Sequence, residues 1–498
     1  MAGDSGEGAK LQLYNTAART KEPLRPLSGK RIAFYSCGPT VYDHAHIGNF
    51  RAFLTYDVLK RWLTYRGFEV DHVCNLTDID DKIIRRMARD GVGLRELTDR
   101  YAALFFEDLA ALNVVPARAY PRATDHVAEI VEMVQTLLEK GLAYENNGSI
   151  YFRVARHSGY GALANLKFEG MQDGAGEGGG ISDLDEYETD KESAKDFALW
   201  KAYKPEDGPV FWETALGKGR PGWHIECSAM ARKYLGDTID IHAGGIDLVF
   251  PHHENEVAQS EGATGKPFCN CWVHNGFVNV GGEKMSKSKG NFLTLRGALA
   301  TALDVRAFRY LVVTSQYRTM LNFTPDVLAG AKSAVKRLDK ARAALSKALE
   351  GGGGEGGDAA AAAAAAAQRA AAAALAQFKG GMDDDLNAPR AAAGLFALIK
   401  AIEKEAKAGS LSAAAAHVYS EALDKMDSVL GVFYEPPGYE PEGGQGGEEG
   451  GAVEIPPDRA AAKAAKDWSS ADAARAAITA RGFAIKDVAG GGVEVTRL

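Results

Sequence analysis

The sequence predicts an α/β chain with a doubly wound parallel sheet, followed by an α-helical bundle and a small C-terminal module. Strand and helix patterns alternate through the first half of the chain, with glycine turns after several strands. Helical periodicity dominates after Phe323. A length of 498 residues is also too great for one compact core, so several domains are expected.

The first elements are a strand, a helix and a second strand. A short buried strand from Arg31 to Ser36 stops at Gly38-Pro39, and the helix after it ends at Gly67. One face of this helix contains Phe50, Phe53, Leu54, Val58 and Trp62. Val70–Cys74 forms the next strand. This order is typical of Rossmann-like sheets, in which ligands bind at the carboxyl ends of the strands.

The same pattern resumes at residues 238–242, where a turn at Gly244-Gly245 precedes a helix expected to start at Pro251. Residues 272–280 form another expected strand, which Gly281-Gly282 turns into a lysine-rich loop. The stretch from about 115 to 212 is interpreted as an insertion with its own helix, hairpin and acidic glycine loop.

The expected domain boundaries follow changes in composition. They are an N-terminal extension (1–29), the sheet domain (30–320), the bundle (321–440), a glycine- and acid-rich linker (441–456) and a small basic module (457–498). Within the bundle, the glycine- and alanine-rich stretch 351–374 is expected to be a tolerated insertion, because it offers little distinctive surface to bury. Residues 382–407 are expected to form one amphipathic helix.

Composition excludes some classes of protein. No apolar run approaches the roughly 20 residues of a membrane span, so no membrane partner is expected. The first ten residues do not resemble a targeting segment, and the odd number of cysteines argues against a disulfide framework. A cytoplasmic location is therefore expected, and an organellar one would require a targeting segment before Met1. The net charge of −8 neither supports nor excludes binding of nucleic acid.

Two motifs far apart in the chain indicate phosphate chemistry, His46-Ile47-Gly48-Asn49 and Lys284-Met285-Ser286-Lys287-Ser288. His46 and Asn49 lie three apart at a helix start, so both face the positive end of the helix. Gly48 allows a nucleotide to approach the backbone closely. The lysines supply positive charge on a loop that can close over ATP. His46 alone would be interpreted as a capping or core histidine.

With both motifs present, the chain resembles the cysteinyl-tRNA synthetases, a class I aminoacyl-tRNA synthetase family, from about Arg31 to Arg497. Asn49 stands where the family usually has a second histidine; it can donate a hydrogen bond to phosphate but cannot become cationic. The resemblance implies a monomer that uses ATP with Mg²⁺ to form cysteinyl-adenylate from L-cysteine. It then transfers the cysteinyl group to tRNA(Cys) and releases AMP and pyrophosphate.

The same resemblance implies one Zn²⁺ per chain, because four residues match the zinc ligands of the family: Cys37, Cys227, His252 and Glu256. Two thiolates, an imidazole and a carboxylate are a plausible zinc set, and each lies near an expected strand end. Zinc would explain the selection of cysteine, because a thiolate is a far better ligand than the hydroxyl of serine. A purely structural zinc site, or four unrelated buried residues, is the alternative interpretation.

The resemblance also assigns neighbouring residues. Gly38, Thr77 and Trp223 belong to the pocket for the substrate amino acid, and Gly245 and Asp247 to the ATP site beside the adenosine. Ordinary core packing is an equally good interpretation of Trp223. Three further histidines are interpreted as supporting partners or as structural residues, and two cysteines as small buried residues: His224, His242 and His253, and Cys269 and Cys271.

The C-terminal part is expected to bind the tRNA anticodon, where Trp468 with Arg475 or Arg481 could stack on unpaired bases. A hydrophobic anchor in a small core is the slightly favoured interpretation of Trp468. Three rival functions stay open. They are a ligase that joins cysteine to a small amine, an inactive scaffold that binds tRNA or nucleotide, and a synthetase for another amino acid.

Overall fold

The computed structural model describes most of the chain and divides it into two compact units, residues 1–439 and 440–498. The described residues are 11–166, 191–285, 292–350 and 358–439, with only the backbone of 483–487 and 493–497. In the second unit, β15 (Phe483–Asp487) pairs antiparallel with β16 (Val493–Arg497). The expected linker, Trp468, Arg475 and Arg481 lie outside the described residues.

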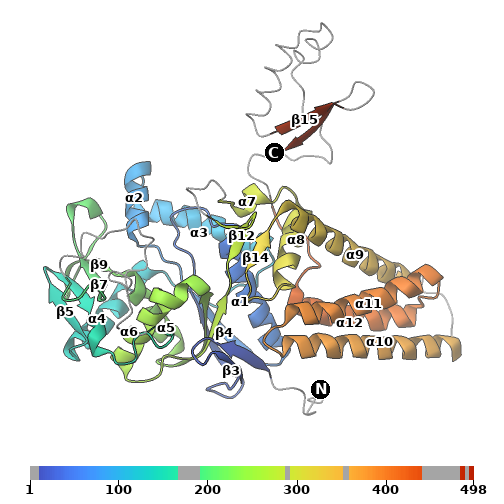
Figure 1. Ribbon diagram of the computed structural model, residues 1–498, viewed down its shortest axis with the longest axis horizontal. Helices are drawn as coiled ribbons and strands as arrows, with labels where there is room; N and C mark the ends of the chain where they lie inside the picture. Colours follow the sequence, from blue (N-terminus) through green and yellow to red (C-terminus); the bar gives the residue numbers. More distant parts are fainter. Residues whose placement is uncertain are drawn as a thin grey trace, which may run out of the picture. The chain divides into compact units, whose positions relative to one another are not determined.

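The predicted parallel sheet is confirmed (Figure 1). Its four strands lie in the order β11-β10-β3-β4, and every neighbouring pair is parallel. The strands are β3 (Arg31–Ser36), β4 (Glu69–Cys74), β10 (Ile239–Gly245) and β11 (Cys269–Asn275). Because the strands are parallel, their carboxyl ends meet at one edge, where Ser36 is opposite both Cys74 and Ala243.

Helix α1 (Ile47–Tyr65) joins β3 to β4 and buries the apolar face that the sequence predicts. The other helices of this part are α2 (Asp81–Asp90), α3 (Leu94–Ala111), α4 (Val127–Glu139), α5 (Trp223–Leu235), α6 (Glu254–Thr264), α7 (Leu295–Ala298) and α8 (Ala302–Val313).

Three sequence-based expectations near the sheet were wrong in detail. Strand β10 continues through Gly245 instead of turning at Gly244-Gly245, because Gly245 still pairs with Asn275 of β11. Helix α6 begins at Glu254, after a kinked segment in which Phe250 has extended backbone angles. The expected strand 272–280 is divided at Gly276, where a Cβ atom would lie only 2.7 Å from the carbonyl oxygen of Thr319.

Beyond that break the chain leaves the parallel sheet. Strand β12 (Val278–Val280) pairs antiparallel with β13 (Glu283–Lys284) and parallel with β14 (Leu321–Phe323). The expected domain boundary at 320/321 therefore falls immediately before a strand that belongs to this three-stranded sheet. This small sheet positions the first half of the lysine-rich loop.

The insertion contains helix α4 and a five-stranded antiparallel sheet, ordered β5-β6-β7-β9-β8. Its strands are β5 (Ala143–Asn146), β6 (Ser149–Phe152), β7 (Phe197–Ala202), β8 (Trp212–Thr214) and β9 (Gly217–Pro221). The expected end at residue 212 falls inside this sheet, which continues to Pro221. The acidic glycine loop, residues 173–190, lies outside the described residues.

The N-terminal segment packs against the parallel sheet. Strands β1 (Gln12–Asn15) and β2 (Thr20–Pro23) form a hairpin. The Asn15 amide donates to the carbonyl oxygen of Asn270 (2.9 Å) and accepts from the backbone N–H of Trp272 (3.0 Å). Residues 11–23 therefore complete the β11 side of the core, although the sequence pattern places them in an extension.

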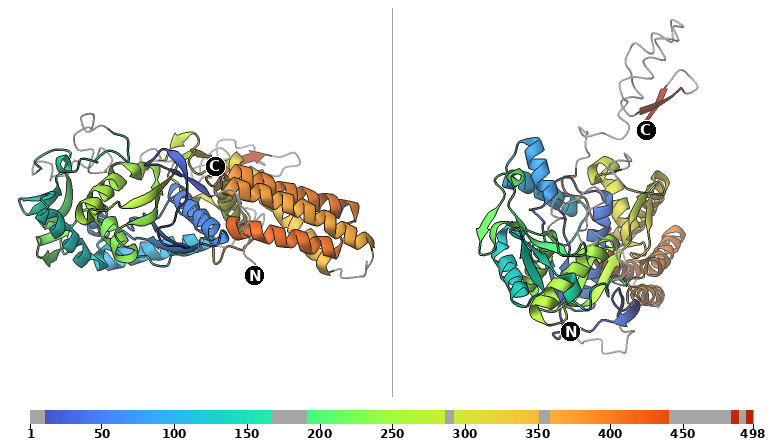
Figure 2. Two further views of the ribbon diagram at one scale, coloured as in Figure 1. Left: turned by 90° about the horizontal axis from the view of Figure 1, so that it is seen from below. Right: turned by 60° about the vertical axis from the view of Figure 1, so that its left-hand side comes forward.

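The predicted helical bundle contains α9 (Pro325–Glu350), α10 (Asp358–Met382), α11 (Ala388–Ala408) and α12 (Ala413–Leu430) (Figure 2). The expectation of a tolerated insertion at 351–374 is corrected, because residues 358–374 form the first part of α10. Ala367, Ala371 and Ala374 are buried at helical spacing. A Cβ atom at Gly394 of α11 would lie 2.6 Å from the carbonyl oxygen of Ala374. Small residues thus bring the two helix backbones close together.

The expected helix 382–407 is interrupted at its start. Helix α10 ends at Met382 and α11 begins at Ala388, and between them Asp385 and Leu386 adopt positive φ angles of 60° and 47°. The buried Asp385 carboxylate accepts hydrogen bonds from the Tyr14 backbone N–H (2.8 Å) and the Tyr317 hydroxyl (2.6 Å). This turn therefore connects the bundle with the N-terminal hairpin and with the segment after α8.

A buried ion pair helps to fix the near end of the bundle to the sheet domain. The Arg309 guanidinium of α8 lies 2.7 Å from the Asp57 carboxylate of α1, and neither side chain is exposed. Arg309 also donates to the carbonyl oxygens of Leu430 at the end of α12 and Leu112 after α3. One side chain therefore links four helices or their ends. In the part of the chain that the structure describes, no helix is both long and apolar enough to cross a bilayer.

We predict that Arg309→Met lowers the free energy of unfolding by about 3 kcal/mol, because the buried Asp57 carboxylate loses one of its two cationic partners and the carbonyl oxygens of Leu430 and Leu112 lose a donor. Arg61 stays 2.9 Å from Asp57 and keeps the loss near the lower end of the usual range. Urea unfolding followed by circular dichroism measures the change. The control is Arg100→Met, whose exposed pair with Glu96 contributes about 0.5 kcal/mol or less. Equal losses in the two variants would contradict the prediction.

Candidate functional site

The four expected metal ligands converge at the carboxyl edge of the parallel sheet. Cys37 follows β3, Cys227 lies on α5, and His252 and Glu256 lie just before and within α6. All four are buried, and their ligand atoms lie within 4.8 Å of one another. The Cys37 and Cys227 sulfurs are 4.0 Å apart, and Nε2 of His252 is 3.1 Å from Oε1 of Glu256.

These distances suit a tetrahedral ion. A zinc ion bound at its usual distances would separate its sulfur, nitrogen and oxygen ligands by about 3.3–3.8 Å. The four ligand atoms can reach that arrangement with small shifts, and two sulfurs with a nitrogen and an oxygen are a donor set that zinc favours. The residues therefore fit the metal that the sequence predicts.

Close contacts change the acidities within this cluster. A hydrogen bond from Cys37 lowers the pKa of the Cys227 thiol to about 6 despite its burial. Burial raises the pKa of the Cys37 thiol well above its ordinary value. Burial also opposes ionisation of Glu256, but His242 and His252 lower the pKa of its carboxyl group to about 2. One thiolate and one carboxylate are therefore available at neutral pH without further proton loss.

A second set of histidines surrounds the cluster. Nε2 of His242 lies 2.8 Å from Oε2 of Glu256, and Nε2 of His253 lies 3.3 Å from the Cys37 sulfur. His224 and His252 approach through their Nδ1 atoms at 2.9 Å. Such contacts orient ligand side chains and fix their tautomers. Cys37, His242, His253 and Glu256 also form an overlapping candidate ligand set, whereas Cys269 and Cys271 belong to neither set among the described residues.

Two polar residues next to the cluster were not found by sequence analysis. His274 bridges His253 (2.7 Å) and the Thr16 hydroxyl (2.7 Å), so a hydrogen-bonded chain leads from the N-terminal hairpin to Cys37. No spacing rule relates Thr16 to a histidine on β11. Only the packing of the hairpin against the sheet brings them together.

The expected substrate residues lie beside the ligand cluster. The buried Thr77 hydroxyl donates to Oε2 of Glu226 (3.0 Å), next to the ligand Cys227. The backbone N–H of Gly38 donates to the Asn75 side chain (2.9 Å). The half-buried Trp223 ring lies over His252, with ring centroids 4.3 Å apart. These three residues therefore surround the same edge of the sheet as the ligands.

The expected adenosine residues follow β10. Gly245 is the last residue of that strand, and Asp247 is exposed in the short helical turn after it. The Asp247 carboxylate folds back over Gly245, where a Cβ atom would lie only 2.4 Å from Oδ1. A side chain at residue 245 would displace this carboxylate.

The first phosphate motif forms a reciprocal cap at the start of α1. Nδ1 of His46 accepts from the Asn49 backbone N–H (3.1 Å), and the Asn49 side-chain oxygen accepts from the His46 backbone N–H (3.0 Å). His46 therefore caps the helix, which was one interpretation of its place in the sequence, and it also lies at the positive end of the helix dipole. A Cβ atom at Gly48 would lie 2.9 Å from the His46 ring, which explains the glycine.

Both ends of the lysine-rich loop meet this helix start. On the first side, the methyl group of Met285 lies 3.2 Å from the position a Cβ atom would take at Gly48. On the second side, the Ile47 backbone N–H donates to the carbonyl oxygen of Leu293 (3.0 Å), and His46 pairs with Thr294. The backbone of Lys284 lies in β13, opposite Asn279. Lys287 lies outside the described residues.

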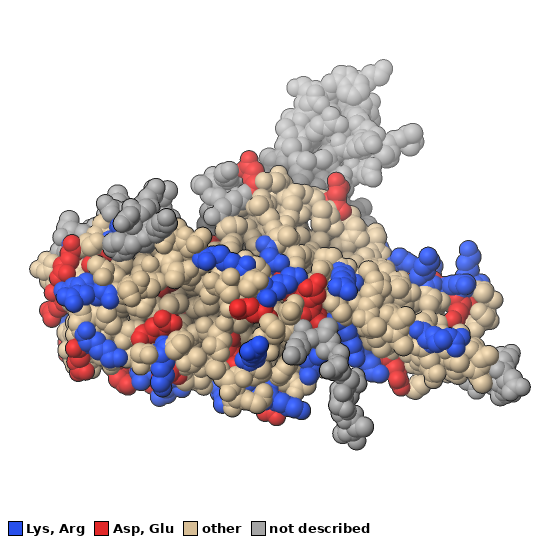
Figure 3. Space-filling view, turned by 60° about the horizontal axis from the view of Figure 1, so that its bottom comes forward, with Lys and Arg blue, Asp and Glu red and all other residues tan. Residues whose placement is uncertain are grey.

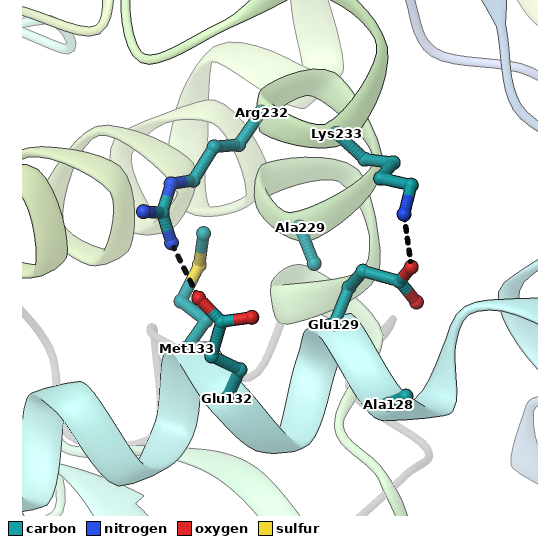
Figure 4. A pocket seen from close by; sticks show the side chains of 7 residues that line it. All are labelled: Ala128, Glu129, Glu132, Met133, Ala229, Arg232 and Lys233. Carbon is teal, nitrogen blue, oxygen red and sulfur yellow. Dashed lines mark ion pairs between the residues drawn. The ribbon is translucent and has the colours of Figure 1, made fainter.

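A pocket between α4 and α5 is lined by charged side chains that pair with one another (Figure 4). Lys233 lies 2.8 Å from Glu129, and Arg232 lies 3.5 Å from Glu132. On the face in Figure 3, basic and acidic side chains are interspersed. The sheet edge therefore remains the best candidate for chemistry.

Two family models match the chain. The model described as the catalytic domain of class I (C) tRNA synthetases matches residues 23–333, and the model described as a DALR domain matches residues 377–434. The first match contains every expected site residue. The second covers α11, α12 and the end of α10.

Curated relatives match along most of the chain. A cysteine–tRNA ligase of Stutzerimonas stutzeri is 44% identical over 97% of this chain and 98% of its own length. A cysteine–tRNA ligase of Thermosynechococcus vestitus is 46% identical over 79% of each chain. Methionyl-tRNA synthetase of Mycobacterium tuberculosis, solved with methionyl-adenylate, has a similar fold, with a TM-score of 0.55 and 17% identity over 81% of this chain and 90% of its own.

We predict that Gly38→Ala disrupts the sheet edge. The added Cβ atom would lie 1.6 Å from the carbonyl oxygen of Asn75, so the ends of β3 and β4 must separate. We expect a loss of about 3 kcal/mol in unfolding free energy, typical of severe overpacking, together with weaker metal binding. Thermal unfolding and metal analysis measure both effects. Gly330→Ala, in open space on α9, is the control, and equal behaviour of the two variants would refute the prediction.

Proposed function

The chain belongs to the class I tRNA synthetases, within the cysteine–tRNA ligases, and on this premise we propose that one zinc ion held by Cys37, Cys227, His252 and Glu256 selects its amino acid. The protein is a cysteine–tRNA ligase. It activates L-cysteine with ATP to cysteinyl-adenylate and transfers the cysteinyl group to the 3′-terminal adenosine of tRNA(Cys), releasing AMP and pyrophosphate.

The observation that carries the zinc proposal is the convergence of four buried ligands from three chain segments, next to Thr77 and Trp223. A bound zinc ion would supply a Lewis acid that prefers the thiolate of cysteine to the hydroxyl of serine. A pocket of ordinary shape discriminates such isosteres by only about 10- to 200-fold. Trp223 and Thr77 would orient the amino acid beside these ligands.

Of the two overlapping ligand sets, we favour the one that contains Cys227 and His252. This set has two sulfurs, which zinc prefers, and the pKa of the Cys227 thiol is lowered to about 6. His253 is already hydrogen-bonded on both ring nitrogens, to Cys37 and His274. It is therefore better suited to orient Cys37 than to replace Cys227.

The start of α1 and the lysine loop would handle ATP, accompanied by Mg²⁺. Adenylate formation spreads negative charge over the phosphates, and positive groups that are already in place stabilise it. The helix end at His46 and Asn49 supplies oriented N–H groups. Lys284 and Lys287 would supply positive charge from a loop whose flanks contact Gly48 and Ile47. Asp247 would bind the ribose hydroxyls after Gly245.

The match to a DALR domain disfavours the rival ligase that joins cysteine to a small amine, because the bundle then serves tRNA. The curated relatives likewise disfavour a synthetase for another amino acid. Cysteine-dependent pyrophosphate exchange by the purified protein tests the remaining rival, an inactive scaffold. We further propose a monomer located in the cytosol, which ultracentrifugation and imaging of a tagged protein can examine.

We predict that Cys227→Ser lowers zinc affinity by about tenfold or more, because even supporting partners of metal ligands contribute that much. Cysteine-dependent pyrophosphate exchange should fall with it. Metal analysis and the exchange assay give the two readouts. Cys269→Ser is the matched control, since this thiol lies outside both ligand sets. Retention of zinc and of activity by Cys227→Ser would rule out the ligand role.

We predict that Lys287→Ala lowers the rate of pyrophosphate exchange by about 100-fold, the usual effect of removing one transition-state contact. Zinc content should not change, because the loop flanks contact α1 and not the ligand cluster. Lys400→Ala, an exposed lysine on α11, controls for the loss of one positive charge. An exchange rate equal to that of the control would argue against the phosphate role.

A further inference from the structure

Helix α7 occupies an unusual position, because it starts where the lysine-rich loop rejoins the phosphate motif. The Thr294 hydroxyl caps this helix by accepting from the Gly297 backbone N–H (2.9 Å). The same residue pairs with His46 of the motif. The residue that caps α7 is therefore in direct backbone contact with the start of α1.

A helix of four residues does not hold its own position. Nucleation of a single helical turn is unfavourable, and the terminal carbonyl groups of such a helix have no partners within it. The placement of α7 must therefore come from contacts with the rest of the protein. Leu295 and Leu299 are fully buried in the hydrophobic core, and among the described residues two polar contacts add to this packing.

The first contact comes from α3. Nε of Arg296 lies 3.0 Å from Oδ1 of Asp108, and the guanidinium also lies 2.7 Å from Glu107. The Asp108 side chain is almost fully buried, and burial raises its pKa to about 6, against the effect of Arg296. This contact holds the side of α7 that faces the sheet domain.

The second contact comes from Tyr439, far away in sequence. Its hydroxyl lies 3.2 Å from the carbonyl oxygen of Leu295 and 2.8 Å from that of Leu299. The single O–H proton is shared between two carbonyl groups at the two ends of α7. Tyr439 is also the last residue of the first compact unit, so the chain that continues into residues 440–498 departs from this contact.

We propose that Tyr439 is a positioning residue for the ATP phosphates, which acts through α7 and Thr294 on His46. The proposal rests on the assignment of His46 to the phosphate site. Tyr439, which directly precedes residues 440–498, would then help to hold in place the residues where the lysine-rich loop ends. The described hydrogen bonds of the Tyr439 hydroxyl go to α7 and Leu299 and not to the candidate zinc ligands or Thr77, so we expect it to act on phosphate chemistry and not on cysteine binding.

Tyr439→Phe in the full-length enzyme tests this role, because it removes only the hydroxyl group. We expect the kcat of cysteine-dependent pyrophosphate exchange to fall about 3- to 10-fold, as for the loss of one well-placed hydrogen bond. The KM for cysteine and the zinc content should not change. Amide hydrogen exchange of residues 295–299 should become faster.

Tyr434→Phe is the matched control. Tyr434 lies five residues earlier in the same segment, is half-buried like Tyr439, and donates its hydroxyl to the carbonyl oxygen of Ala111 (3.0 Å) instead of to α7. Loss of the Tyr434 hydroxyl should change thermal stability about as much as loss of the Tyr439 hydroxyl, and it should leave the kinetics of pyrophosphate exchange unaltered. Equal kinetics in the two variants, or a rise in the KM for cysteine in Tyr439→Phe, would overturn the proposal.

The experiment separates this inference from the proposed function. If the wild-type enzyme itself shows no pyrophosphate exchange, the proposed function fails. If the wild-type enzyme is active and Tyr439→Phe matches it in kcat and in amide exchange of α7, only the role of Tyr439 is refuted.

Discussion

The convergence of Cys37, Cys227, His252 and Glu256 on one buried point is the constraint on which the rest of the site depends. Ionisable groups are costly to bury unless each has a partner. The protein meets this cost by placing histidines around the cluster, so that His242 and His252 hold Glu256 as a carboxylate. These contacts require β3, α5 and α6 to end or start close to one another, which sets the shape of the whole carboxyl edge of the sheet.

The phosphate-handling part depends on a second convergence, between the start of α1 and both flanks of the lysine-rich loop. Arg51 of α1 makes this possible. Its buried guanidinium donates to the carbonyl oxygen of Phe277 and to those of Gln316, Tyr317 and Thr319. It therefore holds the approach to β12 and the turn after α8 against the helix that carries His46. Burial lowers the pKa of Arg51 to about 10, which leaves it charged at neutral pH.

The bundle joins this core at defined points and not through a general apolar face alone. Arg309 connects its last helix to α1, and Asp385 connects the turn between α10 and α11 to the N-terminal hairpin. Gly431, with φ of +60°, ends α12 where a Cβ atom would lie 2.6 Å from the Arg309 guanidinium. The parts that bind tRNA and ATP in the proposed function are therefore connected through buried polar contacts.

The sequence by itself determined the parallel sheet, the capped helix with the His46 motif, and the identity of the four candidate ligands. The sheet and the helix follow from local periodicity, whereas the four ligands follow from the resemblance of their positions to those of a known family. It did not determine that Thr16 and His274 support Cys37, that Ala367–Ala374 pack inside the bundle, or that Tyr439 contacts α7. Those contacts join residues far apart in the chain, and no local pattern encodes them. Only the tertiary structure decided them, because close packing, and not sequence spacing, selects which distant groups meet.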